Sequence, residues 1–202
     1  MEISNECTLY ISNIDSFILN WYSSALYSFN EPNLFHDYIG YDIYRFLWLR
    51  SFDRPVVLSL NKKGTTVWLN YKILDMQPLF YNIGYGSDPS MDTLYEKRGY
   101  KIEIDDEGNR LIRADRRATI VEKKIIKLTE KEWNHFENIL NKINYWGMKE
   151  DSKDRGADGA EWILEAHLKN KYKYVVRRSP AGKFEDAGLY LIKLGSLKED
   201  IY

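Results

Sequence analysis

The chain is poor in the side chains on which most small catalytic and metal sites depend. Its 202 residues include one cysteine and three histidines. The single cysteine, Cys7, excludes an internal disulfide and a zinc site built from cysteines. His36, His135 and His167 lie far apart and lack the spacing of a His-Glu-x-x-His helix. We therefore expect no metal and no cofactor.

Motifs for nucleophilic and phosphate chemistry are also missing. The sequence has neither a Gly-x-Ser-x-Gly elbow nor a Walker-type Gly-Lys-Ser/Thr motif. Gly84-Tyr85-Gly86 has two glycines but does not lead from a strand into a helix, so it is a poor phosphate loop. Asp105-Asp106-Glu107-Gly108 lacks the alternating oxygen ligands and distal glutamate of a calcium loop, and it is interpreted as a hairpin turn. No catalytic residue is assigned.

Neither charge nor hydropathy directs the chain to a polyanion or a bilayer. The formal net charge is −1, so no large field favours nucleic acid. No segment approaches 18 uninterrupted apolar residues, and the stretch from Met1 to Leu9 lacks the pattern of a signal peptide. We expect a protein of the reducing cytoplasm with no nucleic-acid or membrane partner.

Aromatic side chains, in contrast, are abundant. They make up 15% of the residues, with 16 tyrosines and 6 tryptophans. Aromatics favour the pleated, half-buried surfaces of sheets, and they are also enriched in protein–protein contacts. The apolar content of 44% and charged content of 29% are those of a globular protein. Both interpretations of the aromatics therefore stay open, with the sheet favoured.

Hydrophobic periodicity predicts a single α+β domain over residues 1–202. A helix from about Asp15 to Phe29 belongs to a helical N-terminal segment, residues 1–43. Residues 44–202 are predicted to form an antiparallel sheet of several hairpins covered by two or three helices. The predicted strands are Arg45–Phe52, Pro55–Leu60, Thr65–Tyr71, Tyr100–Asp105, Thr119–Lys127, Glu161–Leu168 and Tyr172–Arg178, and the later helices are Glu130–Asn144 and a run from Phe184 to Leu194.

Two segments between these elements have distinct character. Thr129-Glu130-Lys131-Glu132 is a capping box, in which the threonine hydroxyl accepts an amide hydrogen bond and Glu132 reaches back to the start of the helix. The stretch from Asp75 to Gly99 is the least regular and contains two prolines. Long loops without regular structure are often functional or disordered. The sequence assigns this loop no definite role.

Two glutamates in the C-terminal hairpin are candidates for acid–base chemistry. Glu161 and Glu165 share one face of a strand, while Trp162 lies on the other. Two carboxylates can serve as acid and base. They can equally form a solvent face that pairs with Lys173 or Arg177 across the hairpin. The second interpretation is favoured because no further catalytic partner is visible.

Successive arginines at the end of the same hairpin pose a related question. Arg177 and Arg178 point to opposite faces, so one of them must face the core or a neighbouring element. An inward guanidinium needs a carboxylate such as Asp158 or Glu165, because an unpaired buried charge is costly. The alternatives are a structural ion pair, which is favoured, and an anion or partner site. The arginines that bracket Trp48, at positions 45 and 50, raise the same alternatives.

Three blocks of residues, which together span about half of the chain, carry a further pattern. They are Tyr44-Arg45-Phe46 with Trp48-Leu49-Arg50, Phe52 and Pro55-Val56-Val57; Lys127-Leu128-Thr129 with Trp133, Phe136 and Trp146; and Asp158-Gly159 with Trp162-Ile163-Leu164-Glu165, Tyr172, Val175, Arg177, Ser179-Pro180, Phe184 and Leu189-Tyr190-Leu191-Ile192-Lys193-Leu194. In these blocks the chain resembles a family of uncharacterised bacterial proteins. The resemblance implies a bacterial origin and a common fold, and no activity. The family has a Gly-rich loop after the first hairpin, which Gly84-Tyr85-Gly86 matches only in part.

Two functions of different class fit these features. The first is a non-enzymatic binding protein, most concretely a cytoplasmic immunity-type inhibitor that occludes a toxin through aromatic and arginine anchors. The alternative is a small-ligand-binding protein or an enzyme, with a pocket around Arg50, Asp158, Glu165 and Arg177 and with Tyr81 or Tyr85 as a lid. A flat aromatic patch, with the arginines paired with internal carboxylates, would favour the first function, and a deep pocket that holds these polar groups would favour the second. The candidate partner- or ligand-binding residues are Trp48, Arg50, Tyr85, Asp158, Trp162, Glu165 and Arg177.

Overall fold

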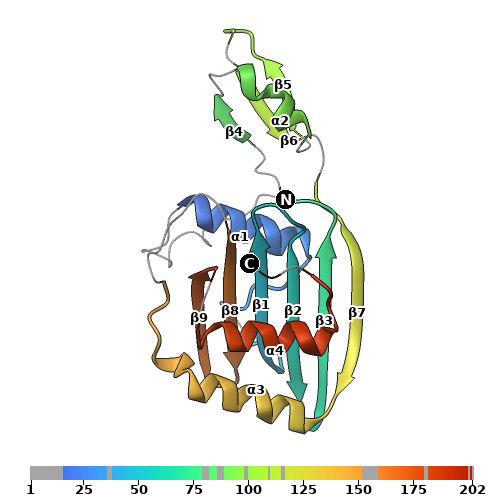
Figure 1. The fold of residues 1–202 in the computed structure, drawn as a ribbon, viewed down its shortest axis with the longest axis vertical. Helices are drawn as coiled ribbons and strands as arrows, with labels where there is room; N and C mark the ends of the chain where they lie inside the picture. The colour runs from blue at the N-terminus through green and yellow to red at the C-terminus, as the bar shows by residue number, and fades with distance from the viewer. Residues whose placement is uncertain are drawn as a thin grey trace. The chain divides into compact units, whose positions relative to one another are not determined.

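The fold has two compact parts, drawn together in Figure 1. The computed structural model describes residues 16–35, 38–78, 82–85, 89–97, 100–108, 110–114, 117–151, 159–179, 182–199 and 201. The larger part, called the sheet unit, comprises residues 28–77 and 118–202. The smaller part, called the small unit, comprises residues 1–27 and 78–117. The predicted α+β class is confirmed, and the division of one domain at residue 43 stays a prediction.

The sheet unit is built on six antiparallel strands in the order β7-β3-β2-β1-β8-β9. Helices α3 and α4 cross one face of this sheet, here called the helix face (Figure 1). The antiparallel sheet of hairpins covered by two or three helices is therefore confirmed. The bounds are β1 Asp42–Arg50, β2 Val56–Lys63, β3 Thr66–Leu74, β7 Ile120–Leu128, β8 Ala160–Leu168, β9 Lys171–Arg178, α3 Glu130–Lys142 and α4 Glu185–Gly195, with a short 3-10 helix η3 at Tyr145–Gly147.

Two tight hairpins set the register of the sheet. Strands β2 and β3 are joined by two residues, and the first of these, Gly64, has a φ of 59° that glycine adopts without strain. The predicted loop began at Asn61, but Asn61 is fully buried within β2, and its side-chain amide donates to the carbonyl of Ser59 at 2.6 Å. Strands β8 and β9 are likewise joined by two residues, 169 and 170. Both predicted hairpins are confirmed, the first with longer strands.

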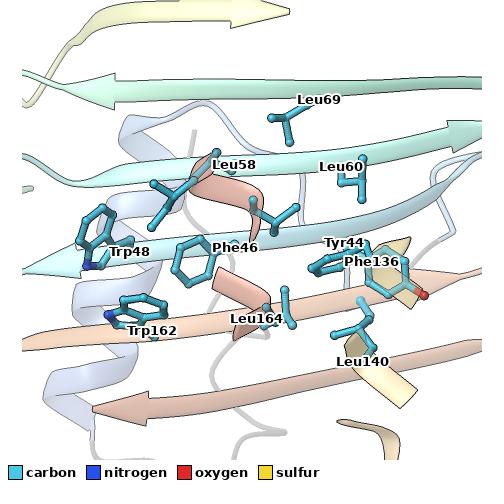
Figure 2. Packing of buried hydrophobic residues seen from close by; sticks show 14 of the residues in the cluster. Tyr44, Phe46, Trp48, Leu58, Leu60, Leu69, Phe136, Leu140, Trp162 and Leu164 are labelled. Atoms are coloured by element: carbon cyan, nitrogen blue, oxygen red, sulfur yellow. The ribbon is translucent and has the colours of Figure 1, made fainter. Parts of the chain in front are cut away.

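The core lies between the helix face and helices α3 and α4. Figure 2 shows its aromatic and aliphatic side chains along the strands. The capping box starts α3 as expected, because the Thr129 amide donates to Glu132 Oε2 at 2.6 Å. The helix ends at Lys142, two residues before the predicted end, and Asn144 follows with a φ of 55°. The labelled core residues are Tyr44, Phe46, Trp48, Leu58, Leu60, Leu69, Phe136, Leu140, Trp162 and Leu164.

The small unit contains a three-stranded sheet in the order β4-β6-β5. The hairpin of β5 (Tyr100–Ile104) and β6 (Arg110–Ala114) was predicted and is confirmed. The stretch from Asp75 to Gly99, expected to be irregular, holds β4 (Asn82–Tyr85), a 3-10 turn η2 (Pro89–Met91) and α2 (Asp92–Lys97). Helix α1 (Ser16–Ser28) lies almost entirely in this unit. No helix among the described residues has the length and apolar character needed to span a membrane.

Candidate functional site

The alternation of side chains along the strands sorts the candidate residues onto two faces of the six-stranded sheet. Trp48 lies two residues before Arg50 on β1, so both belong to the helix face. Trp162 faces Trp48 across the β1–β8 pair, and Arg177 faces Trp162 across the β8–β9 pair. Glu165 is three residues from Trp162 and therefore lies on the opposite face, here called the second face. The predicted pocket that joined Glu165 to Arg50 and Arg177 is therefore wrong.

Trp48 and Trp162 form a pair inside the core. Their ring centroids are 5.7 Å apart, and their exposed fractions are 0% and 1%. Gly188 of α4 makes room for Trp162, because an added Cβ would lie 2.3 Å from Cζ3 of that ring. The interpretation of these tryptophans as exposed anchors for a partner is therefore wrong. Both strand faces are buried at this point, which the aromatic content of the sequence could not reveal.

Arg50 is fully buried at the end of β1, next to this pair. Its Cζ lies 4.4 Å from the ring centroid of Trp48, a cation–π contact. Its Nε donates to the Arg54 carbonyl at 3.1 Å, and its Nη2 lies 2.8 Å from Glu199 Oε2. The expectation that an inward arginine takes a carboxylate partner is confirmed for Arg50. That partner comes from the C-terminal segment after α4.

Three nitrogen donors of this cluster have no acceptor. Within the described part of the chain, Nε1 of Trp48, Nε1 of Trp162 and Nη1 of Arg50 are buried and make no hydrogen bond. An indole or guanidinium N–H can only donate, and an unsatisfied buried donor costs about 1–3 kcal/mol. Figure 2 shows both indole nitrogens on the side of their rings that faces the C-terminal end of β1, where Arg50 follows. We call these three residues the tryptophan–arginine cluster.

The second face carries a different buried cluster, centred on Arg45. Arg45 is 2% exposed, and its guanidinium binds the Glu165 carboxylate through Nε at 3.0 Å and through Nη2. Its Nη1 donates to the Pro32 carbonyl at 2.6 Å and lies 3.6 Å from Glu31 Oε2. The other oxygen of Glu31 lies 2.6 Å from Lys72 Nζ. We call this set the Arg45 network.

Both oxygens of Glu165 are taken inside this network. Oε2 accepts from Arg45, and Oε1 accepts from the Tyr172 hydroxyl at 2.7 Å. Burial, together with the Glu165 charge, raises the pKa of Tyr172 well above its ordinary value, so the hydroxyl stays a donor. Glu161 has a cation of its own, since Arg178 Nη1 lies 3.6 Å from its Oε1. Lys173 and Arg177, the cations predicted to pair with these glutamates, are not their partners.

Arg177 makes its contacts with backbone carbonyls. Its Nη2 donates to the Lys149 carbonyl at 3.0 Å, its Nη1 donates to the Val176 carbonyl at 2.6 Å, and its Cζ lies 5.7 Å from the centroid of the Phe184 ring. Burial lowers the pKa of Arg177, and the nearby carboxyl of Asp151 opposes this effect. The predicted ion pair of Arg177 with Glu165 is therefore wrong. Arg177 instead ties the segment before β8 to the edge of β9.

The side chains of three residues from the predicted sites cannot be placed. Tyr85 lies in β4 of the small unit, and its backbone alone is described. Asp158 and Tyr81 lie outside the described residues. No group of three or more metal-binding side chains occurs in the described ranges.

The outer edge of β7 is a surface feature that the sequence analysis did not identify. β7 is the edge strand of the sheet and pairs with β3 on its inner side. Val121 and Ile125 are 53% and 75% exposed. Lys123 and Lys127 share their strand face and are exposed. The sequence of β7 contained a sign of this exposure. Apolar residues occupy both odd and even positions of the strand, and only one of these two sets can face the core when the strand lies at the edge of the sheet.

Comparisons with family models, with curated proteins and with solved structures found no match to this chain. The resemblance to a family of bacterial proteins, and the bacterial origin that it implies, stay predictions.

Proposed function

We propose that the chain is a binding protein that acts by protein–protein contact, and that the outer edge of β7 is its main contact surface. One observation carries the proposal. A nine-residue edge strand presents two exposed aliphatic side chains, Val121 and Ile125, beside backbone groups that no described strand pairs. Such an edge is a template for an added strand from another chain.

The internal pairing of the buried arginines supports this proposal. Arg45 binds Glu165, Arg50 binds Glu199 and Arg178 lies near Glu161. Arg50 and Glu165, which were predicted to line a small-ligand pocket, thus form ion pairs within the sheet unit. Removing one member of a buried pair is costly, so these residues serve stability first. Contact with a partner then depends on exposed residues.

The chemistry of the β7 edge specifies the kind of partner. Val121, Lys123, Ile125 and Lys127 alternate apolar and positive side chains along one face. A complementary strand would alternate aliphatic and acidic residues, since opposite charges across a strand pair stabilise it by about 0.2–1 kcal/mol each. A second copy of this chain, paired so that apolar residues lie opposite each other, would place lysine against lysine. The edge therefore favours an acidic partner over self-association.

The more specific form of this function is an immunity-type inhibitor that occludes a toxin in the bacterial cytoplasm. A binding protein of this size with a mixed-charge surface suits that role, because steering charges accelerate association and apolar anchors slow dissociation. The partner would then be the product of a neighbouring reading frame.

The test is to co-purify the chain with that product and to measure the affinity by calorimetry. Reversal of two edge charges in the double variant Lys123→Glu, Lys127→Glu should weaken binding by about tenfold or more. Lys131→Glu on the exposed side of α3 is the matched control and should bind as the parent does. Equal affinity of the double variant and the parent would place the contact elsewhere. Absence of any complex with the neighbouring product would overturn the immunity-type form.

A further inference from the structure

The tryptophan–arginine cluster contains three buried donors that meet no acceptor among the described residues. Trp48 and Trp162 are directly opposite in the β1–β8 register, and their ring centroids lie 5.7 Å apart. Arg50 stacks on Trp48 at 4.4 Å. The unpartnered nitrogens, two indole Nε1 atoms and one guanidinium Nη1, are all buried. Buried polar groups in native proteins are almost always hydrogen-bonded, so this coincidence calls for an acceptor.

The packing of α4 fixes one end of the Trp162 indole. Gly188 lies over the six-membered ring of Trp162, with its added Cβ within 2.5 Å of both Cε3 and Cζ3. That end of the ring is therefore fixed beneath the helix. The indole nitrogens lie on the side towards the C-terminal end of β1, as Figure 2 shows for both rings. Donors from two neighbouring strands thus face the same end of the sheet.

Charge narrows the class of ligand. Arg50 and Arg54 share the carboxylate of Glu199, at 2.8 Å and 3.5 Å, so two guanidinium groups have one anion between them. Among the described residues that these ion pairs join, one positive charge is therefore in excess. Indole and guanidinium groups offer donors only, so the complementary group carries lone pairs and negative charge. An oxygen anion has both properties.

We propose that Trp48, Trp162 and Arg50 form a binding site for a small oxyanion, in which two indole N–H groups and Nη1 of Arg50 donate to its oxygens. This site is distinct from the β7 edge and does not depend on the proposed function. The ligand is a carboxylate or an inorganic phosphate, which share this chemistry. Glu199 opposes the anion by its charge and takes one of the nitrogens of Arg50. Affinity therefore rises when the charge of Glu199 is removed.

The experiment follows the indole N–H resonances by ¹H–¹⁵N spectroscopy during titration. Sodium acetate and sodium phosphate are the two arms, with sodium chloride as the background at constant ionic strength. Of the six tryptophan resonances, those of Trp48 and Trp162, assigned with Trp48→Phe and Trp162→Phe, should shift downfield and saturate. Saturation by acetate alone identifies a carboxylate site, and saturation by phosphate alone identifies a phosphate site.

Matched variants separate a binding role from a structural one. Arg50→Lys keeps the charge but loses Nη1, and it should weaken binding by about tenfold, the worth of one charge-assisted hydrogen bond. Arg178→Lys removes another unpaired buried guanidinium nitrogen, on the second face, and should leave the titration unchanged. Glu199→Gln should tighten binding. Glu199 has a side-chain exposure of 17%, so this variant tests the site even where Arg50→Lys fails to fold.

Three results would overturn the proposal. The first is the absence of saturable shifts for these two indoles, and the second is equal shifts of all six. The third is a persistent cross-peak between both indole protons and a long-lived water that saturating anion does not displace, which would make the cluster a hydration site.

Discussion

Gly188 of α4 and Trp162 of β8 are in such close contact that a single methyl group on the glycine would overlap the indole. The added Cβ would lie 2.3 Å from Cζ3 of Trp162 and 2.9 Å from Cζ of Phe46. The helix therefore rests on the aromatic layer of the sheet at a position where only a hydrogen atom fits. This contact sets the depth at which α4 packs against the helix face.

Gly188→Ala should destabilise the protein by about 1–3 kcal/mol, because overpacking a rigid aromatic layer costs this much. In an exposed helix the same change would stabilise by about 0.5–1 kcal/mol, so the sign of the effect is diagnostic. Urea denaturation followed by circular dichroism measures it. The double variant Gly188→Ala, Trp162→Phe should lose less than the sum of its single changes, since the smaller ring relieves the overlap. A more stable Gly188→Ala protein would contradict the close packing.

Glu165→Gln should lower the free energy of unfolding by about 3 kcal/mol. Arg45 is 2% exposed and would lose its main carboxylate, while Glu31 at 3.6 Å compensates only in part. Chemical denaturation at neutral pH measures the loss. Glu130→Gln is the matched control, because its pair with Lys62 is half exposed and worth less than about 1 kcal/mol. Equal losses in the two variants would show that Arg45 does not depend on Glu165.

Tyr71 should titrate late in alkaline solution. Its hydroxyl donates to Glu122, and this hydrogen bond, with burial, raises the pKa of Tyr71 from 10.0 to about 12. Because the folded pKa is raised, the stability contributed by this group is fully present below pH 10 and is lost as pH rises through 12. The difference in tyrosinate absorbance between the parent and Tyr71→Phe isolates this one group. Glu122→Gln should move its midpoint back towards 10; a Tyr71 midpoint already near 10 in the parent would refute the pairing.

Arg177→Ala should act locally. The side chain donates to backbone carbonyls, so we expect a loss of about 1–2 kcal/mol, below that of a broken buried ion pair. The segment before β8 should also loosen from the edge of β9. The Val176 amide, which donates to the Glu150 carbonyl at 2.7 Å, reports this release by faster hydrogen exchange. Unchanged exchange at Val176 would show that Arg177 does not hold the segment.

Local patterns were sufficient to predict most elements of the sheet unit. The capping box at Thr129, the hairpin turn after Leu168, which is one residue shorter than predicted, and the amphipathic run of α4 are each encoded within a few neighbouring residues. The end of β2 was predicted at Leu60 because polar residues follow, but the strand continues through the buried Asn61 to Lys63. Short polar runs look like turns when their tertiary partners are unknown.

The candidate site was harder to predict, because its contacts are distant in sequence. The alternation that places Trp162 and Glu165 on opposite faces could be read directly. The partner of Glu165 could not, since Arg45 is 120 residues away. Likewise, only the folded structure reveals that both tryptophans are core residues and that Gly188 closely approaches Trp162. The exposure of β7 depends on the strand order, which a single sequence does not supply.

The central position of β1 in the sheet has a consequence for folding during translation. β1 pairs with β2 within a few residues but waits for β8, whose Glu165 is 120 residues later than its partner Arg45. At roughly 5–20 residues per second, the edge of β1 that later pairs with β8 stays without a partner for on the order of ten seconds. During this time the nascent chain exposes a strand that is buried in the folded protein, and chaperones can bind it. Codon choice between β1 and β8 would thus set how long β1 lacks its second partner strand.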